Sequence, residues 1–274
     1  MKTGFKNMHI CASPFSDKAR DCGIELTRRL EKQGIRVSPR FSPEVDLVLV
    51  LGGDGYMLDV IHRLDFPDVP LWGFNFGQVG LLMNNVRDAD KILDVLNSKE
   101  FRISEYPLLQ ADVLYRNGKR KKIHAFNEIS AERLGCQNIR LDCHIDGNLL
   151  NRFSGDGLII ATPTGSTAYS FAAGGSVVHA TVPAILLTPV NPHRPVQFHS
   201  LQFPVVLPEK TVIEITVCEH HKRRARLMTD GKDLGSIRRI TVTGSERKMK
   251  LVKVSSYCFT SALLNKIIGG AESV

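Results

Sequence analysis

The chain has 274 residues, of which 43% are hydrophobic and 23% are charged, and its formal net charge is +8. These values are normal for a globular protein with one large domain or two smaller ones, and they favour anionic partners such as nucleotides, polyphosphate or nucleic acid. No apolar run approaches the roughly 20 residues that a membrane-spanning helix needs, and the N-terminal residues lack the apolar core of a signal peptide. We therefore expect no membrane partner.

The first hundred residues alternate between strand and helix patterns. Strands are expected at 8–12, 45–51 and 70–74. Helices are expected from Ser16 or Asp17 to Gly34, around 57–64, and from Asp88 or Asp90 onward, because apolar residues recur there at helical spacing. Strands separated by single helices form a parallel sheet with right-handed crossovers. We predict an α/β domain over residues 1–100.

The second of these strands leads into a glycine-rich turn, Gly52-Gly53-Asp54-Gly55. The run 48–51 is wholly apolar and is typical of a strand buried on both faces. Glycines let a ligand approach the backbone closely, and the carboxyl ends of strands are where open α/β sheets bind ligands. The turn alone is explained equally well by a tight connection with a helix-capping Asp54.

From about residue 100 onward, short alternating strands and turn signals dominate the chain. Turns are expected at 117–118, 146–147, 230–231 and 243–244, each closing a hairpin. We predict a mainly antiparallel, sandwich-like second domain over residues 101–259. A last helix within 260–274 is expected to pack back on the first domain.

Two segments of this second domain have the composition of ligand sites. In 155–175, an apolar strand leads into a loop of Thr, Pro, Gly and Ser and then into a short helix, where hydroxyls and free amides bind anions. Tyr169 could stack on a base, or it could lie in the core beneath a capping loop. Asn127 and Glu128 interrupt an apolar strand, where they are costly if buried without partners. They could bind a nucleoside or form an exposed pair at a sheet edge.

Other patterns argue against competing chemistries. The basic run 219–226 is better explained as a solvated hairpin loop than as a nucleic-acid or polyphosphate site, and His220 and His221 do not predict a metal site. No P-loop, GxGxxG, HExxH or GxSxG motif is present. The six cysteines form no CxxC pair, which indicates thiols in a reducing compartment and predicts a cytoplasmic protein.

Taken together, the motifs resemble those of the NAD kinase family from about residue 45 to the end of the chain. The GGDG turn is shared with diacylglycerol kinases and phosphofructokinases, whereas the block 162–169 is much more specific to NAD kinases. The matching blocks are 52–55, 73–80, 127–128, 155–175, 187–193 and 229–231. The resemblance implies an α/β N-terminal domain, a β-sandwich C-terminal domain and an NAD site between them.

The family resemblance also implies an activity and the residues that carry it. A terminal phosphoryl group would pass from ATP or polyphosphate to the adenosine 2′-hydroxyl of NAD, with Asp54 as the base and Gly52, Gly53 and Gly55 at the donor phosphates. Mg²⁺ or another divalent cation would be held mainly by those phosphates, and no protein metal site is expected. The chain would form a homodimer or homotetramer. The positions that match NAD contacts are Asn127, Glu128, Asp156, Thr162, Thr167, Ala168, Tyr169, Ala172 and Asp230.

Three residues depart from the usual family pattern near the nucleotide and donor pockets: Tyr56, Gln78 and Leu81. They leave open a catalytically weak NAD(P)-binding regulator on the same fold. A lipid or sugar kinase based on the GGDG turn alone leaves the 162–169 loop without a use, and nucleic-acid binding rests only on charge.

Overall fold

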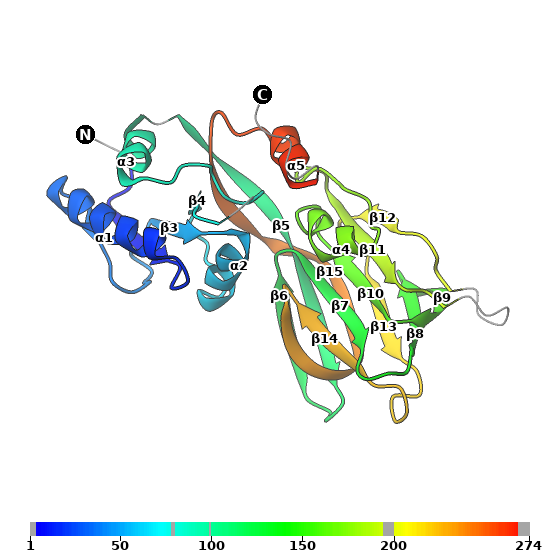
Figure 1. The fold of residues 1–274 in the computed structure, drawn as a ribbon. Helices are drawn as coiled ribbons and strands as arrows, with labels where there is room; N and C mark the ends of the chain where they lie inside the picture. The colour runs from blue at the N-terminus through cyan, green and yellow to red at the C-terminus, as the bar shows by residue number, and fades with distance from the viewer. Residues whose placement is uncertain (1–3, 78–79, 99, 194–199, 268–274) are drawn as a thin grey trace. The chain divides into compact units, whose positions relative to one another are not determined.

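The computed structural model describes residues 4–77, 80–98, 100–193 and 200–267 (Figure 1). The chain forms two compact units, the first made of Met1–Glu105 with Met249–Val274 and the second of Tyr106–Lys248. The chain thus enters the second unit five residues later than the predicted boundary and returns to the first at Met249, well before the predicted last helix. No helix in the described ranges is both long enough and apolar enough to span a membrane.

The first unit is built on a parallel sheet in the order β4-β3-β1-β2, with the end of β15 beside β4. All six residues of β3 are buried, as its sequence predicts. This part of the α/β prediction is confirmed. The strands are β1 (Asn7–Ala12), β2 (Arg36–Val37), β3 (Leu47–Gly52) and β4 (Leu71–Asn75), and the helices are α1 (Asp17–Lys32), α2 (Asp54–Arg63), α3 (Ala89–Ser98) and α5 (Phe259–Ile267).

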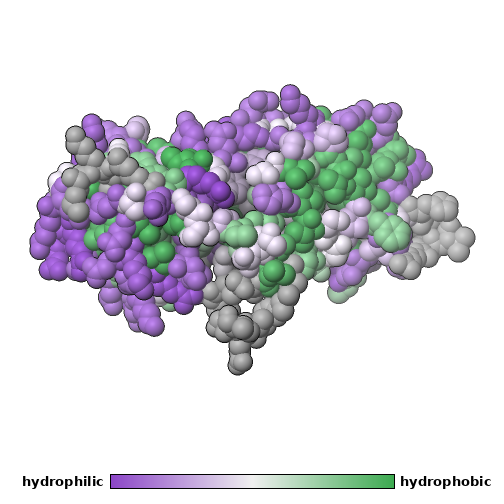
Figure 2. All heavy atoms as spheres, turned by 90° about the horizontal axis from the view of Figure 1, so that it is seen from above, coloured by the Kyte–Doolittle hydropathy of each residue, from purple (hydrophilic) through white to green (hydrophobic). Residues whose placement is uncertain are grey.

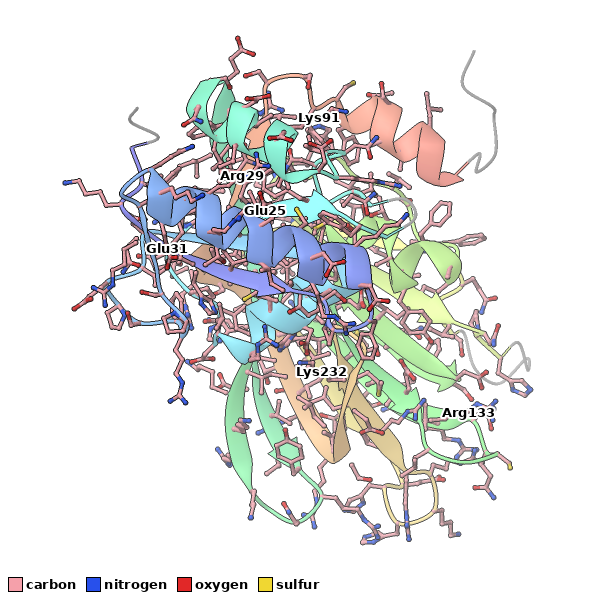
Figure 3. The ribbon with its side chains drawn as sticks, turned by 60° about the vertical axis from the view of Figure 1, so that its left-hand side comes forward. Glu25, Arg29, Glu31, Lys91, Arg133 and Lys232 are labelled. Atoms are coloured by element: carbon pink, nitrogen blue, oxygen red, sulfur yellow. The ribbon has the colours of Figure 1, made fainter. Side chains whose placement is uncertain are left out.

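Helix α1 shows how local sequence sets these elements. Ser16 is its N-cap and accepts the backbone N–H of Ala19, and Gly34 has a positive φ of 78° just beyond its end. Its buried residues recur at the helical spacing expected from the sequence; they are Ala19, Cys22, Gly23, Leu26 and Leu30. On the exposed side, Arg29 pairs with Glu25 one turn earlier and with Asp90 of α3 (Figure 3).

The second unit consists of antiparallel strands around one apolar core, to which nearly every strand contributes. This confirms the predicted all-β second domain. Its elements are β5 (Phe101–Tyr115), β6 (Arg120–Ala125), β7 (Glu128–Arg133), β8 (Ile139–Ile145), β9 (Asn148–Gly155), β10 (Gly157–Ala161), η1 (Gly165–Thr167), α4 (Tyr169–Ala172), β11 (Ala184–Val190), β12 (Val205–Pro208), β13 (Ile213–Val217), β14 (Ala225–Thr229) and β15 (Lys232–Val254).

One predicted hairpin is wrong. Residues 243–244 lie inside β15, which continues through them without a turn. The Gly244 N–H donates to the Glu209 carbonyl at 3.1 Å, and a Cβ at Gly244 would lie 2.6 Å from that oxygen. The glycine therefore permits a close backbone approach rather than a turn. The hairpin at 230–231 is confirmed, with φ of 45° at Asp230 and 79° at Gly231.

Candidate active site

The GGDG turn connects β3 to α2, and it holds a single carboxylate. Gly53 is the N-cap of α2 and Asp54 is its first residue, so the turn is not closed by a capping Asp side chain. The Asp54 carboxylate instead accepts the backbone N–H of Leu81 at 2.8 Å and that of Leu82 at 3.1 Å. Each oxygen has one amide donor, and a carboxylate oxygen can accept a second hydrogen bond. The alternative role of Asp54 as a helix cap is therefore wrong.

The backbone of this turn lies against the glycine-rich segment that follows β4. The Phe76 N–H donates to the Gly52 carbonyl at 2.7 Å, and a Cβ at Gly77 would lie 3.4 Å from the Gly53 Cα. Next to them, a Cβ at Gly80 would lie only 2.6 Å from Asp54 Oδ1. The two glycine-rich segments thus fix where the carboxylate sits.

This packing makes Gly80→Ala a specific test of how tightly Asp54 is held. Because the added methyl group would overlap Asp54 Oδ1 at 2.6 Å, the carboxylate or the amides of residues 81 and 82 must move. We expect turnover to fall by about 10-fold or more, since small misplacements of catalytic groups are costly. Steady-state kinetics measure this. A Gly80→Ala enzyme whose turnover equals that of the unmodified protein would contradict the expectation.

In the second unit, Asp230 organises the start of β7. Its carboxylate accepts three backbone N–H groups, those of Phe126 at 2.8 Å, Asn127 at 2.7 Å and Glu128 at 3.0 Å. The Asp230 N–H also donates to the Glu128 carbonyl at 3.1 Å. Asp230 therefore supports the Asn–Glu pair, and its predicted contact with NAD stays a prediction.

Asn127 and Glu128 are both buried, with 7% and 8% of their surface exposed. β7 lies between β10 and β14, so the alternative of an exposed pair at a sheet edge is wrong. Within the described part of the chain, the Asn127 Oδ1 atom is buried without a hydrogen-bond partner, as are Oγ1 of Thr164 and Oγ1 of Thr229. Buried polar atoms are normally satisfied, so these atoms are suited to a ligand that supplies donors.

The Thr/Pro/Gly/Ser loop packs directly on the same backbone. Thr162 Oγ1 donates to the Phe126 carbonyl at 2.8 Å, and the Thr162 N–H donates to the Asn127 carbonyl at 2.8 Å. A Cβ at Gly165 would lie 2.1 Å from the Asn127 carbonyl oxygen, so only glycine fits there. Asn127, Glu128, Thr162 and Asp230 thus form one hydrogen-bonded cluster.

The predicted NAD contacts in η1 and α4 differ in their exposure to solvent. Thr167 is buried in η1, whereas Ala168 is half-buried and Ala172 is exposed. Tyr169, at the start of α4, is 38% exposed, so its alternative place in the core is wrong. Its ring is available for stacking.

Asp156 lies apart from this cluster within the second unit. It precedes β10, whereas Thr162 follows that strand, and six steps of extended chain separate their Cα atoms by roughly 20 Å. Asp156 pairs at 2.8 Å with Arg133, which is labelled in Figure 3, and accepts the Asn191 side-chain N–H at 3.0 Å. Its predicted contact with NAD stays a prediction.

Two of the three departures from the family pattern can be described. The Tyr56 hydroxyl donates to the Ala12 carbonyl at 2.9 Å, and a Cβ at Gly52 would lie 2.7 Å from its ring. Leu81 is buried, and its N–H is one of the two amides on Asp54. Gln78 lies outside the described residues.

The basic run lies mainly in the connection between β13 and β14, with its last two residues in β14. The predicted hairpin loop is wrong, because β13 pairs with β8 and β15 whereas β14 pairs with β7 and β15. The His220 and His221 rings are 4.0 Å apart in that connection. In the ranges that the structure covers, no group of three or more His, Cys, Asp or Glu side chains is placed to hold a metal ion.

The first unit is a parallel α/β unit with one fixed carboxylate at a glycine turn. The second is an antiparallel unit with a buried amide beside a hydroxyl-rich loop. Together these features indicate a nucleotide-binding phosphotransferase. Comparisons with known proteins specify the class further. Residues 8–101 match the ATP-NAD kinase N-terminal domain and residues 129–254 match the ATP-NAD kinase C-terminal domain. The chain belongs to the NAD kinase family.

Individual relatives agree with the family models. The chain is 34% identical to an NAD kinase of Thermomicrobium roseum over 82% of this chain and 76% of the relative. It is 31% identical to an NAD kinase of Zymomonas mobilis over 87% and 88% of the two chains. The crystal structure of yeast NADH kinase has a TM-score of 0.81 and 25% identity, covering 98% of this chain and 89% of that one. These comparisons give no support to a non-catalytic regulator or to a lipid or sugar kinase.

Proposed function

We propose that the protein transfers the terminal phosphoryl group of ATP, or of polyphosphate, to the adenosine 2′-hydroxyl of NAD to give NADP. The observation that carries the proposal is the Asp54 carboxylate, fixed by two backbone amides at the carboxyl end of a buried strand. Phosphoryl transfer needs little covalent chemistry from the protein, and positioning and charge stabilisation dominate. One oriented carboxylate is sufficient as the general base.

In this reaction Asp54 accepts the proton of the 2′-hydroxyl as the oxygen bonds to the terminal phosphorus. The bond from that phosphorus to the bridging oxygen of the donor breaks, and ADP, or polyphosphate one unit shorter, leaves. The first amides of α2 and the glycine backbone at residues 52, 53 and 55 face the donor phosphates, because a helix N-terminus without a side-chain cap has N–H groups available for anions. Mg²⁺ or another divalent cation, held mainly by those phosphates, would neutralise charge on the transferred group.

The second unit supplies the nucleoside site. Asn127 Oδ1 is a buried acceptor suited to an adenine amino group, and Tyr169 offers an exposed ring for stacking. Glu128 and the threonine hydroxyls of the 162–167 loop suit ribose hydroxyls. The yeast relative is described in complex with NADH, and the matching family models are those of ATP-NAD kinases.

The direct test is an assay of pure protein with NAD and Mg²⁺ and, in separate reactions, ATP or polyphosphate. We expect NADP, detected by an NADP-specific dehydrogenase, with ATP as donor, and the polyphosphate reaction shows whether that donor is also used. A protein that binds NAD but forms no NADP with any donor, while a homologous NAD kinase is active in the same buffer, would contradict the proposal.

We also propose that the active form is a cytoplasmic homodimer or homotetramer. All six cysteines are free thiols, which suits a reducing compartment. Exposed large apolar side chains of the second unit include Phe171, Val182, Phe203 and Val206, and Figure 2 shows apolar surface gathered on this unit. Such surface supports association between copies of the chain.

A further inference from the structure

Lys253, near the end of β15, is a lysine with only 1% of its surface exposed. Its ammonium donates to the carbonyl of Leu81 at 2.9 Å and to that of Leu82 at 2.7 Å. The Tyr257 hydroxyl also donates to the Leu81 carbonyl at 2.9 Å, and Lys253 Nζ lies 4.0 Å from the centroid of the Tyr257 ring. Because burying a charge is costly, an ammonium in this place needs an explanation beyond packing.

The two carbonyls belong to the same short segment whose amides hold Asp54. The peptide group between Leu81 and Leu82 connects the charges directly: its carbonyl accepts from Lys253 at 2.9 Å, and its N–H donates to Asp54 at 3.1 Å. An ammonium on the oxygen side polarises the peptide, which strengthens the hydrogen bond on its N–H side. One peptide dipole therefore lies between a buried cation and the reacting carboxylate.

We propose that Lys253 is a positioning residue for the phosphoryl-transfer reaction, acting through the Leu81–Leu82 peptide to hold the amides that orient the Asp54 carboxylate. This inference rests on the proposed function, because it assumes that Asp54 receives the 2′-hydroxyl proton. Lys253 itself contacts the Leu81 and Leu82 carbonyls and the Tyr257 ring.

The electrostatics of the site are consistent with this role. Burial lowers the pKa of Lys253 from 10.5 to about 7, and Arg102 lowers it further, whereas Asp54 opposes the shift. The charged form is therefore fully present only below about pH 7 and is lost as the pH rises through that value. A neutral amine can still donate to the carbonyls but polarises the peptide less. Among the residues that the structure describes, Asp54, Arg102 and Tyr257 are the charged and titratable groups that act on Lys253.

The test compares Lys253→Met with Lys250→Met. Methionine keeps the apolar stem and removes the donors, and Lys250 lies in the same strand but pairs with the exposed Asp68. Calorimetry gives the stoichiometry of NAD binding and therefore the fraction of protein molecules that bind NAD. The kcat of each variant is divided by this fraction. We expect normalised kcat to fall about 10-fold or more in Lys253→Met, with KM for NAD changed less than about threefold, and Lys250→Met to match the unchanged enzyme.

The pH profile separates positioning from a merely structural role. We expect kcat of the unchanged protein to show a titration near pH 7 that Lys253→Met lacks and Lys250→Met keeps. Unfolding in urea measures the free energy of unfolding at each pH and needs no substrate. Because the folded-state pKa is lowered, the unfolded chain binds more protons between about pH 7 and 10.5, and the unchanged protein should gain stability relative to Lys253→Met as pH rises from 7 to 9.

A normalised kcat in Lys253→Met within about twofold of the unchanged enzyme, or a pH profile that keeps its titration near pH 7, would overturn the inference. If Lys253→Met does not fold, Lys253→Gln decides, because its side-chain amide keeps an N–H donor but carries no charge. A several-fold fall in normalised kcat supports the inference, and an unchanged kcat overturns it. The proposed function is tested separately, because it fails if the protein without any substitution forms no NADP.

Discussion

Asp54→Asn is expected to lower the rate of NADP formation by about 10²–10⁴-fold, the contribution of a well-placed general base. Asparagine keeps the size of the side chain, but it cannot take up the proton of the 2′-hydroxyl. Its NH₂ group also replaces one of the two oxygens that accept the Leu81 and Leu82 amides. NAD binding, measured by calorimetry, should stay within a few-fold of the unchanged protein.

A matched control lies on the same helix. Asp59 is half exposed and pairs with Arg63 at 3.7 Å, so Asp59→Asn should leave turnover unchanged. If Asp54→Asn retained turnover comparable to that of Asp59→Asn, Asp54 would not be the base. Loss of NAD binding together with turnover would instead point to a disturbed fold.

Asp230→Ala is expected to have the largest effect on stability. It leaves three buried backbone N–H groups, at residues 126, 127 and 128, without their acceptor. Each such loss costs about 1–3 kcal/mol, so we expect the free energy of unfolding to fall by at least about 3 kcal/mol. NAD affinity should weaken as well, because the backbone of Asn127 and Glu128 is no longer fixed. Urea unfolding and calorimetry measure the two effects.

Asp146→Ala is the matched control for Asp230→Ala. Asp146 also has a positive φ, 48°, at a hairpin turn, but its exposed carboxylate accepts only the Val212 N–H in the described structure. The strain of alanine at positive φ is therefore common to both variants. Equal losses of stability in the two variants would show that the three amide bonds contribute little.

The parts of the fold set by neighbouring residues were predictable from the sequence. Ser16 and Gly34 define α1, and the apolar run before Gly52 defines β3 and the place of Asp54. These are local signals, namely caps, spacing and turn residues. The nucleoside cluster was also recognisable, because an amide and a carboxylate in an apolar strand are unusual.

What was missed depends on contacts between residues distant in the sequence. Asp230 holds amides about 100 residues earlier in the chain, and Gly244 is required by the carbonyl of Glu209, which no local pattern shows. Lys253 contacts carbonyls more than 170 residues away. Its one signal in the sequence was a lone lysine in the apolar run 251–254, which alternation alone would place on an exposed face.

The most direct measurement is a crystal structure of the protein with NAD bound, read as the distance from the nearer Asp54 carboxylate oxygen to the adenosine 2′-oxygen. We predict hydrogen-bond contact, about 2.6–3.2 Å, with the Leu81 and Leu82 amides still on the carboxylate. A ribose bound elsewhere, with its 2′-oxygen well beyond about 3.5 Å and no water between it and Asp54, would contradict the assignment of this carboxylate as the base.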